Sequence, residues 1–247
     1  MEQDPGFWAL AVLAAVLTGM GKGGLPIVGM LGVPVLALSV PAVTAAGLLL
    51  PVFILSDLFG LYAYRHSFDR RNLAILVPAA VLGIAIGWAT ASLVEGWVVN
   101  ALVGVIGLSF ALTLLLRRGP EGPPRPARVA PGLFWGAITG FTSFVSHAGA
   151  PPYQVYVLPQ RLEKMVYAGT TTILFAIVNA VKLVPYYALG QLSAANLRVA
   201  AVLALPAALA VFAGLWLVKV IPERLFFTLV TWALLLVSLR LLWAALA

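Results

Sequence analysis

Lys22, Asp57 and Lys182 are charged residues inside hydrophobic stretches of the sequence, where a charge is costly. A charged side chain near the centre of a bilayer costs at least about 2.5–3.5 kcal/mol on insertion scales. Such residues are rare in membrane spans and usually mark the path of an ion or a proton. Two lysines and one carboxylate are groups that can bind a small anion and respond to protons.

Lys22 lies in a glycine-rich interruption of an apolar stretch, next to Gly21, Gly23 and Gly24. Glycines let the backbone turn and expose its N–H groups, and a helix that resumes near Pro26 would point its positive end into the same region. Amides, a helix N-terminus and a lysine together predict an anion site. The alternative is a lysine that snorkels to the surface. An apolar arm of only eleven residues precedes the break and would place Lys22 near mid-depth, which favours the anion site.

Lys182 shares a predicted helix face with two polar residues, because it follows Asn179 by three positions and precedes Tyr186 by four. An ammonium, an amide and a phenol that converge can hold an oxyanion. Alternatively, Asp57 neutralises Lys182 and leaves no free charge. Asp57 itself could carry a proton, balance a bound cation, form a buried ion pair or cap an unwound segment.

A second interruption covers residues 143–152 and contains His147. This histidine would titrate near neutral pH and respond to protons, or it would hold the loop by a hydrogen bond. Ser146 precedes it directly, but adjacent residues do not by default form a nucleophile–base pair, so no enzyme activity is predicted. Thr170 and Thr171, near a helix start, could coordinate substrate or bond to neighbouring helices.

The composition is that of a polytopic membrane protein, because 62% of the 247 residues are hydrophobic and 9% are charged. No cysteine is present, which excludes disulfides and thiolate metal sites. The sequence has no Walker motif, dinucleotide fingerprint or metal-ligand cluster, so we predict neither a cofactor nor a metal. The net charge of +7 comes largely from short loops beside apolar spans. This pattern indicates positive-inside anchoring and not nucleic-acid binding.

Hydropathy predicts six full membrane spans and two interrupted segments. The interrupted segments cover residues 7–38 and 132–158. Residues 118–131 are rich in proline and arginine and form a predicted linker between the two halves, 1–117 and 132–247. The six full spans are predicted at 43–64, 73–94, 98–116, 165–189, 197–220 and 225–246.

The two halves resemble each other weakly along their length. Pro26 matches Pro151 at a spacing of 125, and Asp57 falls on Asn179 at a spacing of 122. The sequence Asn72-Leu73 matches Asn196-Leu197 at a spacing of 124. This drift of a few residues indicates a duplication with small changes in loops.

Loop charges favour re-entrant hairpins at the two interruptions, although full crossings stay open. With re-entrant hairpins, the arginine-rich and lysine-rich loops and the central linker face the cytoplasm, and the acidic N-terminus lies outside. Each half then crosses three times, so the halves are inverted repeats, as in many secondary transporters. The predicted fold is therefore an all-α integral membrane protein with two inverted repeats. Each repeat contains a broken or re-entrant helix and three transmembrane helices, in a bacterial inner membrane.

Three short motifs resemble the TauE/SafE sulfite exporter family: Gly21-x-Gly23-Gly24, Pro34-x-Leu36 and Ala168-Gly169-Thr170-Thr171. The resemblance covers nearly the whole chain, including the duplicated halves and the basic central loop. It implies export of sulfite, sulfoacetate or related organosulfur or small organic anions.

The sequence as a whole predicts a secondary transporter of a small anion, such as sulfite or an organosulfonate. The predicted substrate-binding residues are Gly21, Lys22, Gly23, Gly24, Thr170, Thr171, Asn179, Lys182 and Tyr186. Asp57 and His147 would couple transport to protons, and access would alternate by movement of one half against the other. An anion channel and a membrane scaffold that transports nothing are the alternatives. The predicted partners are the anion and the lipid bilayer, and a homodimer stays open.

Overall fold

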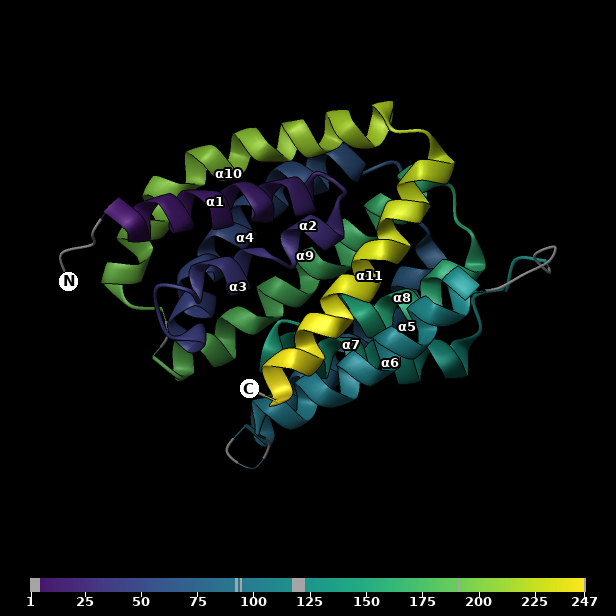
Figure 1. Cartoon of the computed structure of the whole chain (residues 1–247), viewed down its shortest axis with the longest axis horizontal. Helices are drawn as coiled ribbons and strands as arrows, with labels where there is room; N and C mark the ends of the chain where they lie inside the picture. The colour runs from purple at the N-terminus through teal and green to yellow at the C-terminus, as the bar shows by residue number, and fades with distance from the viewer. Residues whose placement is uncertain (1–4, 92, 94, 117–122, 191, 247) are drawn as a thin grey trace. The chain divides into compact units, whose positions relative to one another are not determined.

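The computed structural model describes residues 5–91, 93, 95–116, 123–190 and 192–246, and all regular structure in these residues is helical (Figure 1). Eight helices of the described chain have at least 18 residues and are apolar enough to span a membrane. The prediction of an all-α membrane protein is therefore confirmed. The eight helices are α1 (Pro5–Lys22), α4 (Ala42–Tyr64), α5 (Arg70–Ala89), α6 (Gly96–Leu116), α7 (Val129–Ser146), α9 (Lys164–Ala188), α10 (Ala194–Val220) and α11 (Glu223–Leu246). Shorter helices are α2 (Pro26–Gly29), α3 (Gly32–Leu36), α8 (Ala150–Val157) and the 3₁₀ turn η1 (Leu158–Gln160).

Each predicted full span coincides with one long helix, and most ends agree within about three residues, as expected for element boundaries. The largest difference is at α5, which ends at Ala89 and not at residue 94. Two predictions fall outside the described residues. These are the placement of the acidic N-terminus, residues 1–4, and the part of the linker at residues 118–122.

Both interruptions are shorter than predicted. Helix α1 continues through Gly19 and Gly21 to Lys22, and α7 continues to Ser146, so each has 18 residues. The helix that ends at Lys22 is therefore longer than the predicted arm of eleven residues. The mid-membrane depth that this arm predicted for Lys22 does not follow. The reason is that the glycines of α1 are packed against other helices. A Cβ on Gly19 would lie 2.0 Å from the carbonyl oxygen of Ala207.

The chain forms two compact units, and each combines helices from both predicted halves. Unit 1 consists of Met1–Phe68 and Ala168–Val220, and unit 2 consists of Asp69–Tyr167 and Ile221–Ala247. The division into units reflects how the helices pack and does not test whether the two halves arose by duplication. The repeat boundaries therefore stay a prediction.

Unit 1 is organised by close contact between α1 and α10, which lie side by side in Figure 1. A Cβ on Gly23 would lie 2.4 Å from the carbonyl oxygen of Val211 and 2.7 Å from the Cα of Gly214. Helix α4 packs against both α1 and α10. Small residues at helix crossings let backbones approach closely, which is how helices associate within lipid.

Unit 2 is organised in the same way by α5 and α7. A Cβ on Gly140 would lie 1.9 Å from the carbonyl oxygen of Ala80, and one on Gly83 would lie 2.0 Å from that of Ala137. The buried amides of Asn72 and Gln160 bond to each other twice, at 2.8 and 3.1 Å. They join α5 to η1. Helices α6 and α11 complete the unit by packing against each other.

Large apolar side chains stay exposed along the long helices of both units. Leu205 of α10 is 67% exposed and Leu236 of α11 is 62% exposed. A soluble protein rarely exposes apolar patches of this extent, whereas a bilayer covers them. The exposed apolar residues therefore agree with the hydropathy of the eight helices.

Candidate functional site

The first interruption is a tight turn that ends α1 directly after Lys22. Gly24 has a backbone φ of +108°, which residues with a side chain rarely adopt. A Cβ added to Gly24 would lie 2.1 Å from the hydroxyl oxygen of Tyr64. Pro26 then occupies the first position of α2, where the missing N–H costs no helical bond. The turn therefore fixes Lys22 as the last residue of its helix, where a cation interacts favourably with the helix dipole.

Tyr64, at the end of α4, holds this turn in place. Its side chain is fully buried, and its hydroxyl donates a hydrogen bond of 2.8 Å to the carbonyl oxygen of Gly23. Within unit 1, the turn after Lys22 is thus tied to the helix that carries Asp57.

We expect Tyr64→Phe to lower the free energy of unfolding by about 1–3 kcal/mol, because the buried Gly23 carbonyl loses its donor. The measurement is thermal unfolding of the purified protein in detergent. Tyr62→Phe is the matched control, because Tyr62 lies on the same helix and is 71% exposed. Equal stability of the two variants would contradict the role of Tyr64.

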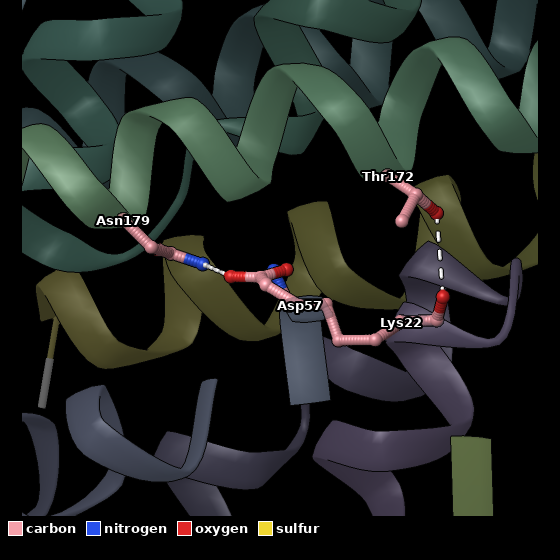
Figure 2. Close-up of polar contacts among 4 residues, drawn as sticks. All are labelled: Lys22, Asp57, Thr172 and Asn179. Carbon is pink, nitrogen blue, oxygen red and sulfur yellow. Dashed lines mark hydrogen bonds and ion pairs between the residues drawn. The ribbon is translucent and has the colours of Figure 1, made fainter. Parts of the chain in front are cut away.

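Lys22, Asp57 and Asn179 form a buried chain of contacts (Figure 2). The Lys22 ammonium lies 2.6 Å from Oδ1 of Asp57. The Asn179 side-chain amide donates a hydrogen bond of 2.9 Å to the other carboxylate oxygen, Oδ2. Both oxygens of the carboxylate are therefore engaged, by a cation from α1 and by an amide from α9.

Two further contacts position Lys22. The Thr172 hydroxyl donates to the Lys22 carbonyl oxygen at 3.4 Å, which attaches the end of α1 to α9 (Figure 2). The ammonium nitrogen lies 5.4 Å from the ring centroid of Phe53, within range of a cation–π interaction. Lys22 is 7% exposed, so burial within the unit, and not snorkelling, describes its side chain.

Lys182 and Tyr186 lie further along α9 and are buried, as are Thr170 and Thr171 near its start. Lys182 is 1% exposed and interacts electrostatically with both Lys22 and Asp57. We refer to Lys22, Asp57, Asn179 and Lys182 as the Lys22–Asp57 cluster. The predicted residues Thr170, Thr171 and Tyr186 lie on the same helix in the same unit.

The cluster contains more basic than acidic groups. Lys22, Asp57 and Lys182 are the only buried charged side chains among the described residues, and all three belong to unit 1. With both lysines protonated and Asp57 ionised, the formal charge of the cluster is +1. Excess positive charge in a low-dielectric interior is unfavourable, and a bound monoanion would neutralise it.

The glycines beside Lys22 have a different role from the one predicted. The N–H of Gly23 donates to the Gly19 carbonyl at 2.9 Å, and that of Gly24 donates to the Gly21 carbonyl at 3.2 Å. A Cβ on Gly21 would lie 2.5 Å from the Cα of Gly29, so this glycine allows α1 and α2 to meet. The structure therefore shows turn formation and close packing at these glycines, and substrate binding by their amides stays a prediction.

His147 belongs to unit 2 and ends α7. Its backbone is left-handed, with φ of +54°, and its side chain is half-buried. Few residues other than glycine adopt this backbone conformation, and those that do are found at turns and functional sites. Its predicted part in proton coupling stays a prediction.

Three buried polar side chains were missed by sequence reasoning. The hydroxyls of Thr18 and Ser56 and both amide atoms of Gln154 have no hydrogen-bond partner among the described residues. Thr18 precedes Lys22 by one helical turn, and Ser56 adjoins Asp57. Their position beside charged residues was the available signal. Gln154 lies in α8, within the second interrupted segment. Buried polar groups of this kind call for an explanation, such as water or a ligand.

One comparison with known proteins identifies a family. The family model described as "Sulfite exporter TauE/SafE" matches residues 7–241, nearly the whole chain. No curated protein and no solved structure matched the chain in the same comparisons. A match of this extent shows family membership and supports a membrane transporter of sulfur-containing anions. The chain therefore belongs to the TauE/SafE sulfite exporter family.

Proposed function

We propose that the protein is a secondary transporter that exports a small oxyanion, such as sulfite or an organosulfonate, from the cytoplasm of a bacterium. The observation that carries the proposal is the Lys22–Asp57 cluster, in which two lysines and one carboxylate are buried together. With both lysines protonated and Asp57 ionised, its formal charge is +1. A site with this charge attracts a monoanion and offers it two ammonium groups. The family supports the same class of substrate.

The anion would compete with Asp57 for Lys22. In the structure, the ammonium of Lys22 is bound to the carboxylate at 2.6 Å. An entering oxyanion would take the place of Asp57 beside Lys22, and Lys182 would provide the second cation. The buried hydroxyls of Thr18 and Ser56 would donate further hydrogen bonds to the oxyanion, because neither has a partner among the described residues.

Release of Lys22 would couple the anion to a proton. A buried carboxylate that loses its ammonium partner is costly while it stays ionised, so Asp57 would then take up a proton. Asn179 suits both states of Asp57, because a side-chain amide can donate to a carboxylate or accept from a carboxylic acid. Access would alternate by movement of one half of the chain against the other.

Flux through proteoliposomes tests the proposal directly. Uptake of radiolabelled sulfite and sulfoacetate is measured with and without an imposed pH gradient. We expect saturable flux that responds to the gradient. Flux that neither saturates nor depends on pH would indicate a channel, and absence of flux for every anion would indicate a scaffold. Either result would contradict the proposal.

Lys182→Gln should reduce this flux at least about tenfold, because a hydrogen bond to a charged group contributes about 1.5–3 kcal/mol. Lys219→Gln is the matched control, since Lys219 is an exposed lysine of α10 in the same unit. If both variants transport like the original protein, Lys182 has no part in substrate binding.

A further inference from the structure

Unit 2 contains a cavity of about 270 Å³ that is separate from the Lys22–Asp57 cluster. It lies where the end of the central linker meets α7 and the segment α8–η1. Its lining combines cations, aromatic rings and prolines: Arg125, Arg128, Pro131, Trp135, Tyr156 and Pro159. A volume of this size holds a small polar group such as a phosphate with its substituents.

Backbone hydrogen bonds fix the linker against the rest of unit 2. The N–H of Arg125 donates to the carbonyl of Pro159 at 3.0 Å, and the Tyr156 hydroxyl donates to the carbonyl of Arg128 at 3.0 Å. Arg71 of α5 donates to the carbonyl of Ala127 at 2.8 Å. The two arginines of the cavity are thus anchored through their main chain, which leaves their side chains available.

Both guanidinium groups are available for an anion. Neither Arg125 nor Arg128 forms an ion pair or a side-chain hydrogen bond with a described residue. Two like charges that line one cavity repel each other until an anion lies between them. The planar guanidinium binds phosphate oxygens in a two-pronged geometry, so a phosphate group suits this pair.

The surroundings of the cavity indicate that the phosphate carries acyl chains. Phe134 of α7 is 59% exposed, and its ring packs edge-to-face against the ring of Trp135, with 5.2 Å between the centroids. Trp135, which lines the cavity, has the amphipathic ring that is enriched where membrane meets water. A free inorganic anion would make no use of these aromatic rings, whereas the chains of a phospholipid would cover them.

We propose that this cavity binds the headgroup of an anionic phospholipid, with the phosphate held by Arg125 and Arg128 and the acyl chains along α7. Basic pockets between membrane helices are suited to such headgroups. This inference is independent of the transported substrate. It assigns a function to the basic linker beyond its topological role.

The test is a thermal-shift titration of the full-length protein in detergent. Phosphatidylglycerol is the probe, phosphatidylcholine is the zwitterionic control, and glycerol 3-phosphate is the water-soluble headgroup without chains. We expect phosphatidylglycerol to raise the unfolding temperature in a saturable way, and the two controls to leave it unchanged. Arg125→Gln and Arg128→Gln should each weaken the apparent affinity about fivefold, and the double variant more, since one basic residue near the surface contributes about 1 kcal/mol.

Arg224→Gln is the matched control, because Arg224 is an exposed arginine of unit 2 that does not line the cavity. It should respond to phosphatidylglycerol like the original protein. A double variant whose affinity lies within twofold of Arg224→Gln would overturn the proposal. An equal shift with glycerol 3-phosphate would overturn the assignment to a lipid, because a free anion would then suffice.

Discussion

Lys22→Gln is expected to lower the free energy of unfolding by about 3–5 kcal/mol and to abolish anion binding, because it leaves Asp57 buried without its cation. Asp57 is 3% exposed. Among the described residues, Lys22 is the one that forms a salt bridge with its carboxylate. Asn179 would still donate its hydrogen bond at 2.9 Å, but a neutral amide does not balance a charge. Chemical or thermal unfolding in detergent measures the first effect, and a ligand-induced thermal shift measures the second.

A double variant separates the two effects. Lys22→Gln combined with Asp57→Asn removes both charges, so most of the lost stability should return, as is found when buried pairs are replaced together. Anion binding should not return, because the cation is still missing. Recovery of binding in the double variant would show that Lys22 is not a ligand. A single variant as stable as the original protein would show that Asp57 does not need Lys22.

Gly140→Ala should destabilise the protein by about 1–3 kcal/mol, because overpacking forces the surrounding backbone to shift. The added Cβ would lie 1.9 Å from the carbonyl oxygen of Ala80, which is a backbone atom and cannot move by a rotamer change. Helices α5 and α7 would have to separate. Because this pair organises unit 2, the effect should appear as a lower unfolding temperature and a lower yield of folded protein.

Gly96→Ala is the matched control for Gly140→Ala. Gly96 also lies in a helix, at the start of α6, and no atom lies within 4 Å of its added Cβ. We expect this variant to be as stable as the original protein or slightly more stable, since alanine favours helix. Equal losses in both variants would mean that helix propensity, and not the α5–α7 contact, determines the outcome.

The fold class and the six full spans could be predicted because long apolar runs are local features of the sequence. The ends of the two interruptions could not, because glycine has two uses. Gly19 allows α1 to approach α10 and leaves the helix intact, whereas Gly24 requires a left-handed backbone and ends it. Sequence alone does not distinguish a glycine in a helix contact from one in a turn.

The cluster could be predicted in part because buried charges in an apolar chain are few. Lys22, Asp57, Asn179 and Lys182 were all identified, and the comparison of the halves had aligned Asp57 with Asn179. These two residues form a direct hydrogen bond, and the duplication stays a prediction. The contact between Thr172 and the Lys22 carbonyl could not be predicted, because it depends on how α1 and α9 pack.

The wide sequence separation within the cluster has a consequence for biosynthesis. Thr172 lies 150 residues after Lys22, and at about 5–20 residues per second its synthesis follows that of Lys22 by about 8–30 s. Asp57, in contrast, is made within about 2–7 s of Lys22 at the same rates. During this interval the nascent chain holds a lysine and its carboxylate partner in the membrane, without the helix that later covers them. An ion pair formed at this stage would neutralise both groups before α9 is made, and only the finished protein presents the second lysine.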